Sequence, residues 1–182
     1  MKVYYDNDVL SRLVRTDETG PESDALMLLQ ALCTEGRFTK VTSRLSWREQ
    51  QRAPVEQTRV ALKQNRRDSP IVKEDWVRGS YATLEEENGS FASWYTGTHV
   101  VDEDLYRSLL NFGLKEEDAC HLMYAVHNLC ETFLTLDKHF LGTSSNSMRG
   151  ELEKLCRGLR ILKPSELLAE LNLSAHLPNE ES

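Results

Sequence analysis

The sequence has no long apolar run and no leader-like start. A membrane-spanning helix needs roughly 18–20 consecutive apolar residues, and no stretch of the 182 residues approaches that length. The first residues enter a strand pattern directly, without the basic and apolar regions of a signal peptide. We therefore expect a cytoplasmic protein that does not contact a membrane.

Cysteine pairs with metal-binding spacing are also missing. The four cysteines are Cys33, Cys120, Cys130 and Cys156, and none belongs to a Cys-x-x-Cys pair. This spacing argues against a zinc site and against a disulfide framework. Each cysteine lies in an apolar helical or strand context, which predicts buried free thiols in a reducing compartment.

The chain has no excess of basic residues and no glycine-rich phosphate loop. It carries 22 Lys and Arg against 29 Asp and Glu, a net charge of -7. Nucleic-acid-binding domains are usually basic, so RNA binding would depend on a local basic patch. One basic stripe follows i, i+4 spacing along and just beyond a predicted helix over 54–65: Arg59, Lys63, Arg66 and Arg67. A solvated helix face is the alternative interpretation of this stripe.

Short apolar strands alternate with amphipathic helices along the chain. We predict strands at Lys2–Tyr5, 38–42, 131–136 and 159–162, and helices at 9–14, 22–36, 43–49, 54–65, 102–111, 116–126, 151–157 and 164–173. A Ser- and Asn-rich loop is expected over 142–150. This alternation predicts a three-layer α/β/α domain with a mostly parallel central sheet.

The length suits one domain, which we expect to span residues 1–175. A less regular insert is expected at about 66–101, and residues 176–182 are expected to form a disordered tail. Aromatic residues punctuate the insert: Trp76, Tyr81, Phe91, Trp94 and Tyr95. Packing is the simpler role for them, and base stacking with RNA is the alternative.

Four acidic residues lie at the ends of predicted strands or on the helices that follow them: Asp6, Glu49, Asp118 and Asp137. Ligands gather at the carboxyl ends of parallel strands, so we expect these side chains to converge. Uncompensated carboxylates repel one another, and some would stay protonated. A divalent cation removes this conflict, and hard oxygen ligands suit Mg²⁺ or Mn²⁺.

Each of these acids also has a structural interpretation. Asp6 and Asp137 can cap the helices that follow them. Asp118 can complement a helix dipole, and Glu49 can face solvent and pair with a neighbouring arginine. These alternatives stay open at the level of sequence.

Four further polar residues flank the acids. Thr135 and Ser43 can each hold a carboxylate or a water by the hydroxyl, although Ser43 is equally suited to cap the helix over 43–49. We expect Asp8 to be a helix-start acid rather than a site residue. For His121 we expect a partly buried, hydrogen-bonded histidine rather than a ligand or base.

Five segments, in order, resemble the PIN-domain nucleases, and together they span nearly the whole chain. They are Asp6 with Val9-Leu10, Ser43 with Glu49 six residues later, Asp118-Ala119-Cys120-His121-Leu122, Phe133-Leu134-Thr135-Leu136-Asp137, and the closing strand and helix over 159–168. The chain departs from the family pattern at Asn7, where Thr or Ser is common, and at Asp8, where Asn or a small residue is common.

The resemblance implies a PIN-like fold and a metal-dependent endoribonuclease. Asp6, Glu49, Asp118 and Asp137 would hold Mg²⁺ or Mn²⁺ and, with Thr135, hydrolyse RNA phosphodiester bonds. It also suggests a toxin of a bacterial toxin–antitoxin pair, with an antitoxin protein as partner, and a homodimer. The residues themselves indicate neither a toxin role, nor an antitoxin partner, nor a homodimer.

Two alternatives belong to other classes. A catalytically inactive PIN-like scaffold would bind RNA or protein. The opening segment also resembles the haloacid-dehalogenase phosphatases, in which Asp6 would be the nucleophile and Asp8 the acid/base, with a hydroxyl of Thr42 or Ser43 binding phosphate. That interpretation leaves Glu49 and the closing strand and helix unexplained.

Overall fold

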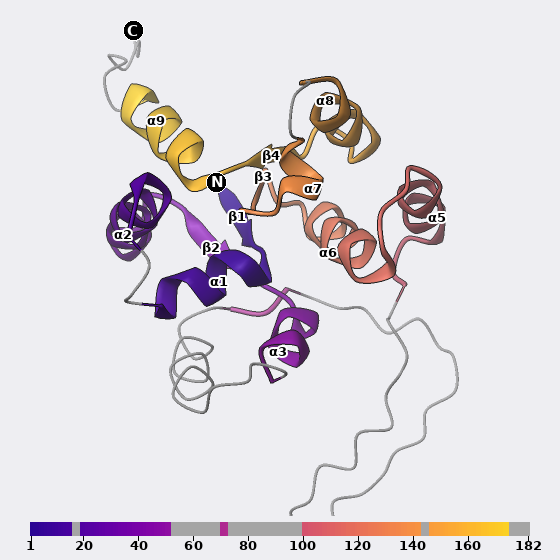
Figure 1. The fold of residues 1–182 in the computed structure, drawn as a ribbon, viewed down its shortest axis with the longest axis horizontal. Helices are drawn as coiled ribbons and strands as arrows, with labels where there is room; N and C mark the ends of the chain where they lie inside the picture. The colour runs from indigo at the N-terminus through magenta and orange to yellow at the C-terminus, as the bar shows by residue number, and fades with distance from the viewer. Residues whose placement is uncertain (16–18, 52–69, 73–99, 143–145, 175–182) are drawn as a thin grey trace, which may run out of the picture.

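A parallel β-sheet forms the centre of the molecule. The computed structural model describes residues 1–15, 19–51, 70–72, 100–142 and 146–174. Its strands are β1 (Lys2–Tyr5), β2 (Thr39–Val41), β3 (Thr132–Leu134) and β4 (Arg160–Leu162). They lie in the order β2-β1-β3-β4 and every pairing is parallel (Figure 1). The prediction of an α/β protein with a mostly parallel sheet is confirmed.

Helices connect the strands. They are α1 (Asn7–Val14), α2 (Pro21–Thr34), α3 (Arg44–Gln51), α5 (Glu103–Asn111), α6 (Glu116–His127), α7 (Lys138–Leu141), α8 (Asn146–Leu155) and α9 (Pro164–Ser174). Local sequence explains several of their starts. Pro21 is the first residue of α2. A backbone N–H at this position has no acceptor within the helix, so proline, which lacks the N–H, costs no hydrogen bond there. The Asp102 carboxylate caps α5 by accepting from the Leu105 N–H at 3.0 Å.

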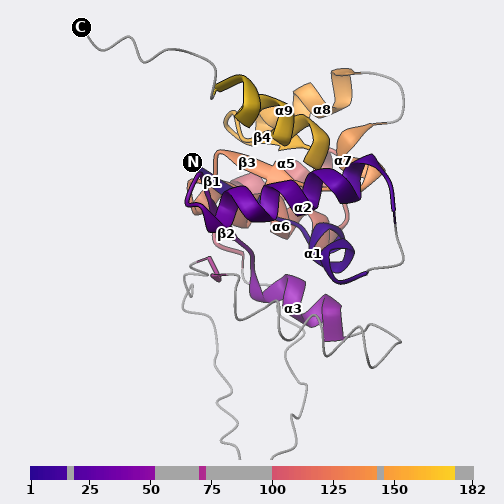
Figure 2. The ribbon, with the colours of Figure 1, turned by 90° about the vertical axis from the view of Figure 1, so that its left-hand side faces the viewer.

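Side chains that alternate along the strands build a core on each face of the sheet. Tyr4 and Phe133 pack on one face with buried residues of α5, α6 and α8. Tyr5 and Leu134 pack on the other face with residues of α1, α2 and α9. Figure 1 shows these two groups of helices on opposite sides of the strands, and Figure 2 shows α2 running across the sheet beside α9.

Two predictions near the C-terminal half need correction. The helix expected over 151–157 begins at Asn146, so half of the expected 142–150 loop is helical. Asn, Ser and Gly are weak helix formers, but contacts outweigh this preference: Arg149 binds Glu166 at 3.0 Å, and Leu152 is fully buried. The four-residue α7 was not predicted, because one turn is too short to show helical periodicity.

Part of the chain is not described. The predicted helix over 54–65, the basic stripe of Arg59, Lys63, Arg66 and Arg67, almost all of the insert over 66–101, and the tail over 176–182 lie outside the described residues. Within the described residues, no helix combines the length and apolarity needed to cross a membrane.

All four cysteines are free, as predicted. Cys120, Cys130 and Cys156 are buried, and Cys33 is half-buried. Burial raises the pKa of both the Cys130 and the Cys156 thiol to about 12. These two thiols therefore stay protonated and unreactive at neutral pH.

A core substitution tests the role of β3. Leu134 is fully buried beneath α1 and α9, so Leu134→Ala should lower the free energy of unfolding by about 2–5 kcal/mol through lost burial and a cavity. Urea denaturation measures this change. Leu28→Ala is the matched control, since Leu28 is 56% exposed on α2 and should change stability by less than about 0.5 kcal/mol. Equal losses in both variants would contradict this packing.

Candidate functional site

The pairing of β1 with β3 brings Asp6 and Thr135 together. Tyr5 lies opposite Leu134 in the parallel register, so the next residue of each strand reaches the same edge of the sheet. The Asp6 N–H donates to the Leu134 carbonyl at 3.0 Å, and the Thr135 hydroxyl donates to Asp6 Oδ2 at 2.9 Å. The expected contact between Thr135 and a carboxylate is present.

Asp6 both caps a helix and faces the site. Its Oδ1 accepts from the Asn7 N–H at 2.7 Å at the start of α1, while Oδ2 binds Thr135. The residue is only 6% exposed. Burial raises the pKa of Asp6, the charge of Glu49 adds to this rise, and His121, Thr135 and Asn7 oppose it. The capping and site interpretations are therefore compatible.

Asp8 lies beside Asp6, although the sequence favoured a plain helix-start acid. Its Oδ2 accepts from the Leu136 N–H at 2.9 Å, and its buried Oδ1 has no hydrogen-bond partner. Burial, followed by the charges of Asp6 and Asp137, raises the pKa of Asp8 to about 8. Helical spacing in the sequence does not predict that Asp8 lies beside Asp6. Asp6 precedes α1, whereas Asp8 lies in the first turn of this helix.

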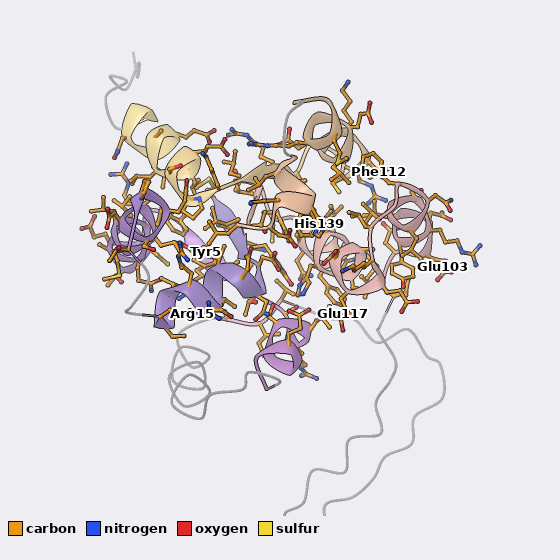
Figure 3. All side chains as sticks on the ribbon, in the orientation of Figure 1. Tyr5, Arg15, Glu103, Phe112, Glu117 and His139 are labelled. Atoms are coloured by element: carbon orange, nitrogen blue, oxygen red, sulfur yellow. The ribbon has the colours of Figure 1, made fainter. Side chains whose placement is uncertain are left out.

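Asp137 follows β3 and shares Thr135 with the two N-terminal acids. The Asp137 N–H donates to Thr135 Oγ1 at 3.0 Å. Its own Oδ1 accepts from the His139 N–H at 2.8 Å and lies 3.1 Å from His139 Nδ1, so it caps α7. His139, labelled in Figure 3, gains a partner that the sequence did not indicate. Thr135 Oγ1 is closer to Asp6 Oδ2 than to Asp8 Oδ2, 2.9 Å against 3.5 Å, so its one proton goes to Asp6.

Asp118 and Glu49 approach from helices. Asp118 lies in the first turn of α6 and is half-buried; burial and then the charge of Asp137 raise its pKa. Glu49 comes from α3, and its Oε1 lies 3.1 Å from His121 Nε2. The Glu49 side chain is 16% exposed. The interpretation of Glu49 as a solvent-facing helix residue is therefore wrong.

His121 and Ser43 belong to a buried polar network behind the acids. His121 is 2% exposed and both ring nitrogens have partners, as expected of a satisfied histidine. Burial alone would lower its pKa, but the hydrogen bond with Glu49 and the nearby acids raise it above the usual value. Ser43 Oγ accepts from the Ser46 N–H at 3.4 Å and meets the Tyr4 hydroxyl, so it caps α3.

The site therefore combines five carboxylates with one hydroxyl. Mutual charge effects link Asp6 to Glu49 and Asp8, and Asp137 to Asp8 and Asp118. Nevertheless, in the described parts of the chain no three His, Cys, Asp or Glu side chains are arranged to ligate one ion directly. The donor set consists of hard oxygen atoms, including the unpartnered Oδ1 of Asp8. Mg²⁺ commonly binds through one or two carboxylates and retains waters, so this donor chemistry suits it.

Comparisons with known proteins do not assign a function. No protein-family model, curated protein or solved structure matches this chain.

The raised pKa of Asp8 predicts how stability depends on pH. The folded protein keeps this proton to about pH 8, whereas an unfolded Asp loses it near pH 3.9. The folded state binds more protons in this window, so the free energy of unfolding falls as pH rises from about 4 to 8. Asp8→Asn should reduce that slope and stabilise the protein by about 1–3 kcal/mol above pH 8.

Urea denaturation across this pH range measures the effect. Glu151→Gln on α8 removes an exposed charge and is the control, with the wild-type slope retained. Parallel stability curves for Asp8→Asn and wild type would show that Asp8 is not protonated in the folded state.

Proposed function

We propose that this chain is a metal-dependent endoribonuclease with a PIN-like three-layer fold. One observation carries the proposal: Thr135 contacts Asp6, Asp8 and Asp137 at the carboxyl ends of β1 and β3. Glu49 and Asp118, from two further segments, interact by charge with Asp6 and Asp137, respectively. Helices packed against both faces of an all-parallel sheet support the fold assignment. Ligand sites of open parallel sheets occur at this edge.

The acids are better suited to binding a cation than to stabilising the fold alone. Asp6 and Asp8 are bound by a hydroxyl and backbone amides, and burial raises the pKa of both. Strongly perturbed pKa values cluster at functional sites, where burial and neighbouring like charges shift them. A divalent cation would stabilise their ionised form.

Asp6, Asp8, Glu49, Asp118 and Asp137 are the proposed acids around one or two Mg²⁺ or Mn²⁺ ions. One or two of them would bind each ion directly, and the others would act through its bound waters. Such an ion supplies a bound water of lowered pKa and offsets charge on the phosphate. Thr135 holds Asp6 in place through its hydroxyl and is in turn fixed by the Asp137 N–H. RNA is the proposed substrate.

The phosphatase alternative is less well supported. It requires a hydroxyl of Thr42 or Ser43 to bind phosphate, but both residues are fully buried. The Thr42 hydroxyl contacts the Tyr5 carbonyl at 3.1 Å and Ser46 Oγ at 3.0 Å. The Ser43 hydroxyl meets Tyr4 at 2.7 Å. Neither is free to receive a substrate.

A thermal-melt titration with Mg²⁺ and Mn²⁺ tests the proposed metal site. A ligand that binds only the folded state at 100 times its Kd stabilises it by about 2.7 kcal/mol. For a chain of this size, that should raise the Tm by roughly 5–10 °C. The rise should be absent in Asp118→Asn and retained in Glu116→Gln, which removes an exposed acid from the same turn of α6.

The outcomes separate the hypotheses. A rise in wild type and in Glu116→Gln but not in Asp118→Asn supports a cation among these carboxylates. No rise in any protein would favour the inactive scaffold.

Cleavage of a fluorescent RNA library tests the activity itself. Asp6→Asn should fold normally yet reduce cleavage at least a hundred-fold, because it loses a cation ligand worth several kcal/mol of transition-state stabilisation. Glu116→Gln is again the control and should cleave like wild type. Equal cleavage by Asp6→Asn and wild type would disprove the assigned site, and a covalent aspartyl-phosphate on Asp6 would point to the phosphatase instead.

A further inference from the structure

A buried hydrogen-bond chain leads from the sheet to Glu49. It starts at Tyr4 on β1, whose hydroxyl lies 2.7 Å from Ser43 Oγ and 2.7 Å from His121 Nδ1. The Tyr4 ring is fully buried and stacks on Phe133 with 5.4 Å between the ring centroids. Tyr4 therefore offers its hydroxyl from a fixed position in the core.

His121 continues the chain from α6. Its ring meets Tyr4 edge-on, with centroids 5.9 Å apart and planes at 67°. The flanking residues of the helix, from Ala119 to Val126, are all buried, so the ring has little room to rotate. Contact with Tyr4 through Nδ1 turns Nε2 outward, toward α3.

Glu49 ends the chain at the rim of the acidic site. His121 Nε2 lies 3.1 Å from Glu49 Oε1, and an ionised carboxylate can only accept. The proton of this hydrogen bond therefore belongs to Nε2. Glutamate has three rotatable side-chain bonds, and orienting them costs entropy. An anchored Oε1 reduces that cost and leaves Oε2 as the oxygen for a further ligand.

We infer that His121 is a positioning residue, which Tyr4 holds in place and which orients Glu49 toward the cation. The inference rests on the proposed metal site and adds a residue that does not itself touch the ion. Carboxylates that bind metals are commonly fixed by such hydrogen bonds, and losing one typically weakens metal binding 10- to 100-fold.

Two substitutions separate the partners of His121. In His121→Gln, the amide nitrogen can occupy the place of Nε2 and donate to Glu49, while the contact with Tyr4 is lost. In His121→Asn, the shorter amide can occupy the place of Nδ1 and meet Tyr4, while Glu49 is released. Both variants remove the ring from the core, so they share the packing defect and differ in the contact under test.

Calorimetric titration with Mn²⁺ measures the effect without any activity assay. His121→Asn should bind Mn²⁺ about 10- to 100-fold more weakly than wild type. His121→Gln, which keeps the contact with Glu49 but loses the one with Tyr4, should recover part of this loss. Melting in chelator measures the metal-free stability of both variants. A structural role alone would lower the Tm and the affinity together, with no rescue by Gln, and would overturn the inference.

A double-mutant cycle tests whether His121 acts through Glu49. In a Glu49→Gln background, His121→Asn should weaken Mn²⁺ binding little further, because the group it orients is already changed. Additive losses would overturn the inference. If His121→Asn fails to fold, Tyr4→Phe replaces it: the ring stays, the hydroxyl is lost, and weaker Mn²⁺ binding is expected.

The controls distinguish failure of the proposed metal site from failure of the positioning role of His121. If wild type binds Mn²⁺ and Asp6→Asn does not, while His121→Asn binds like wild type, only the positioning role is wrong. If wild type itself binds no Mn²⁺, the metal site is wrong and the positioning role falls with it.

Discussion

Parallel pairing of β1 with β3 is the constraint on which the site depends. It places Tyr5 opposite Leu134, so both chains leave the sheet at the same edge and Asp6 meets Thr135. Because both faces of the sheet are packed with helices, a one-residue slip would move each side chain of β1 into the opposite core, where its shape does not fit its neighbours. The position of the acids is therefore fixed by the same apolar contacts that stabilise the fold.

Gathering carboxylates in this way is unfavourable unless something offsets their repulsion. Elsewhere the chain offsets a partly buried acid with a base: the Arg149 guanidinium binds Glu166, whose pKa is lowered despite its burial. At the site the pKa values of Asp6, Asp8 and Asp118 are raised instead. The fold thus pairs Glu166 with a base but places Asp6, Asp8 and Asp118 near other acids, and this difference supports the proposed cation site.

The sequence predicted the elements whose signals are local. Apolar runs predicted the four strands that the described residues form, and the position of Asp6, Thr135 and Asp137 at strand ends followed from them. Asp8 was assigned a lesser role, because the sequence does not show that α1 starts at Asn7 and directs both acids toward β3. The contacts of His121 with Tyr4 and Glu49 span 117 and 72 residues. No periodicity encodes such contacts, so they became visible only in the folded chain.

The choice of histidine beside Glu49 has a physical reason. Arginine tends to bind both oxygens of a carboxylate, and in this chain Arg149 Nη1 lies within 3.1 Å of Oε1 and 3.0 Å of Oε2 of Glu166. A carboxylate held in that way has both oxygens engaged by the guanidinium, and in Glu166 the oxygen Oε2 also accepts from the Lys163 N–H at 3.1 Å. Histidine donates one proton from Nε2 to one oxygen, and its other nitrogen keeps it bound to the core. It can therefore orient Glu49 without competing for the oxygen that a cation would use.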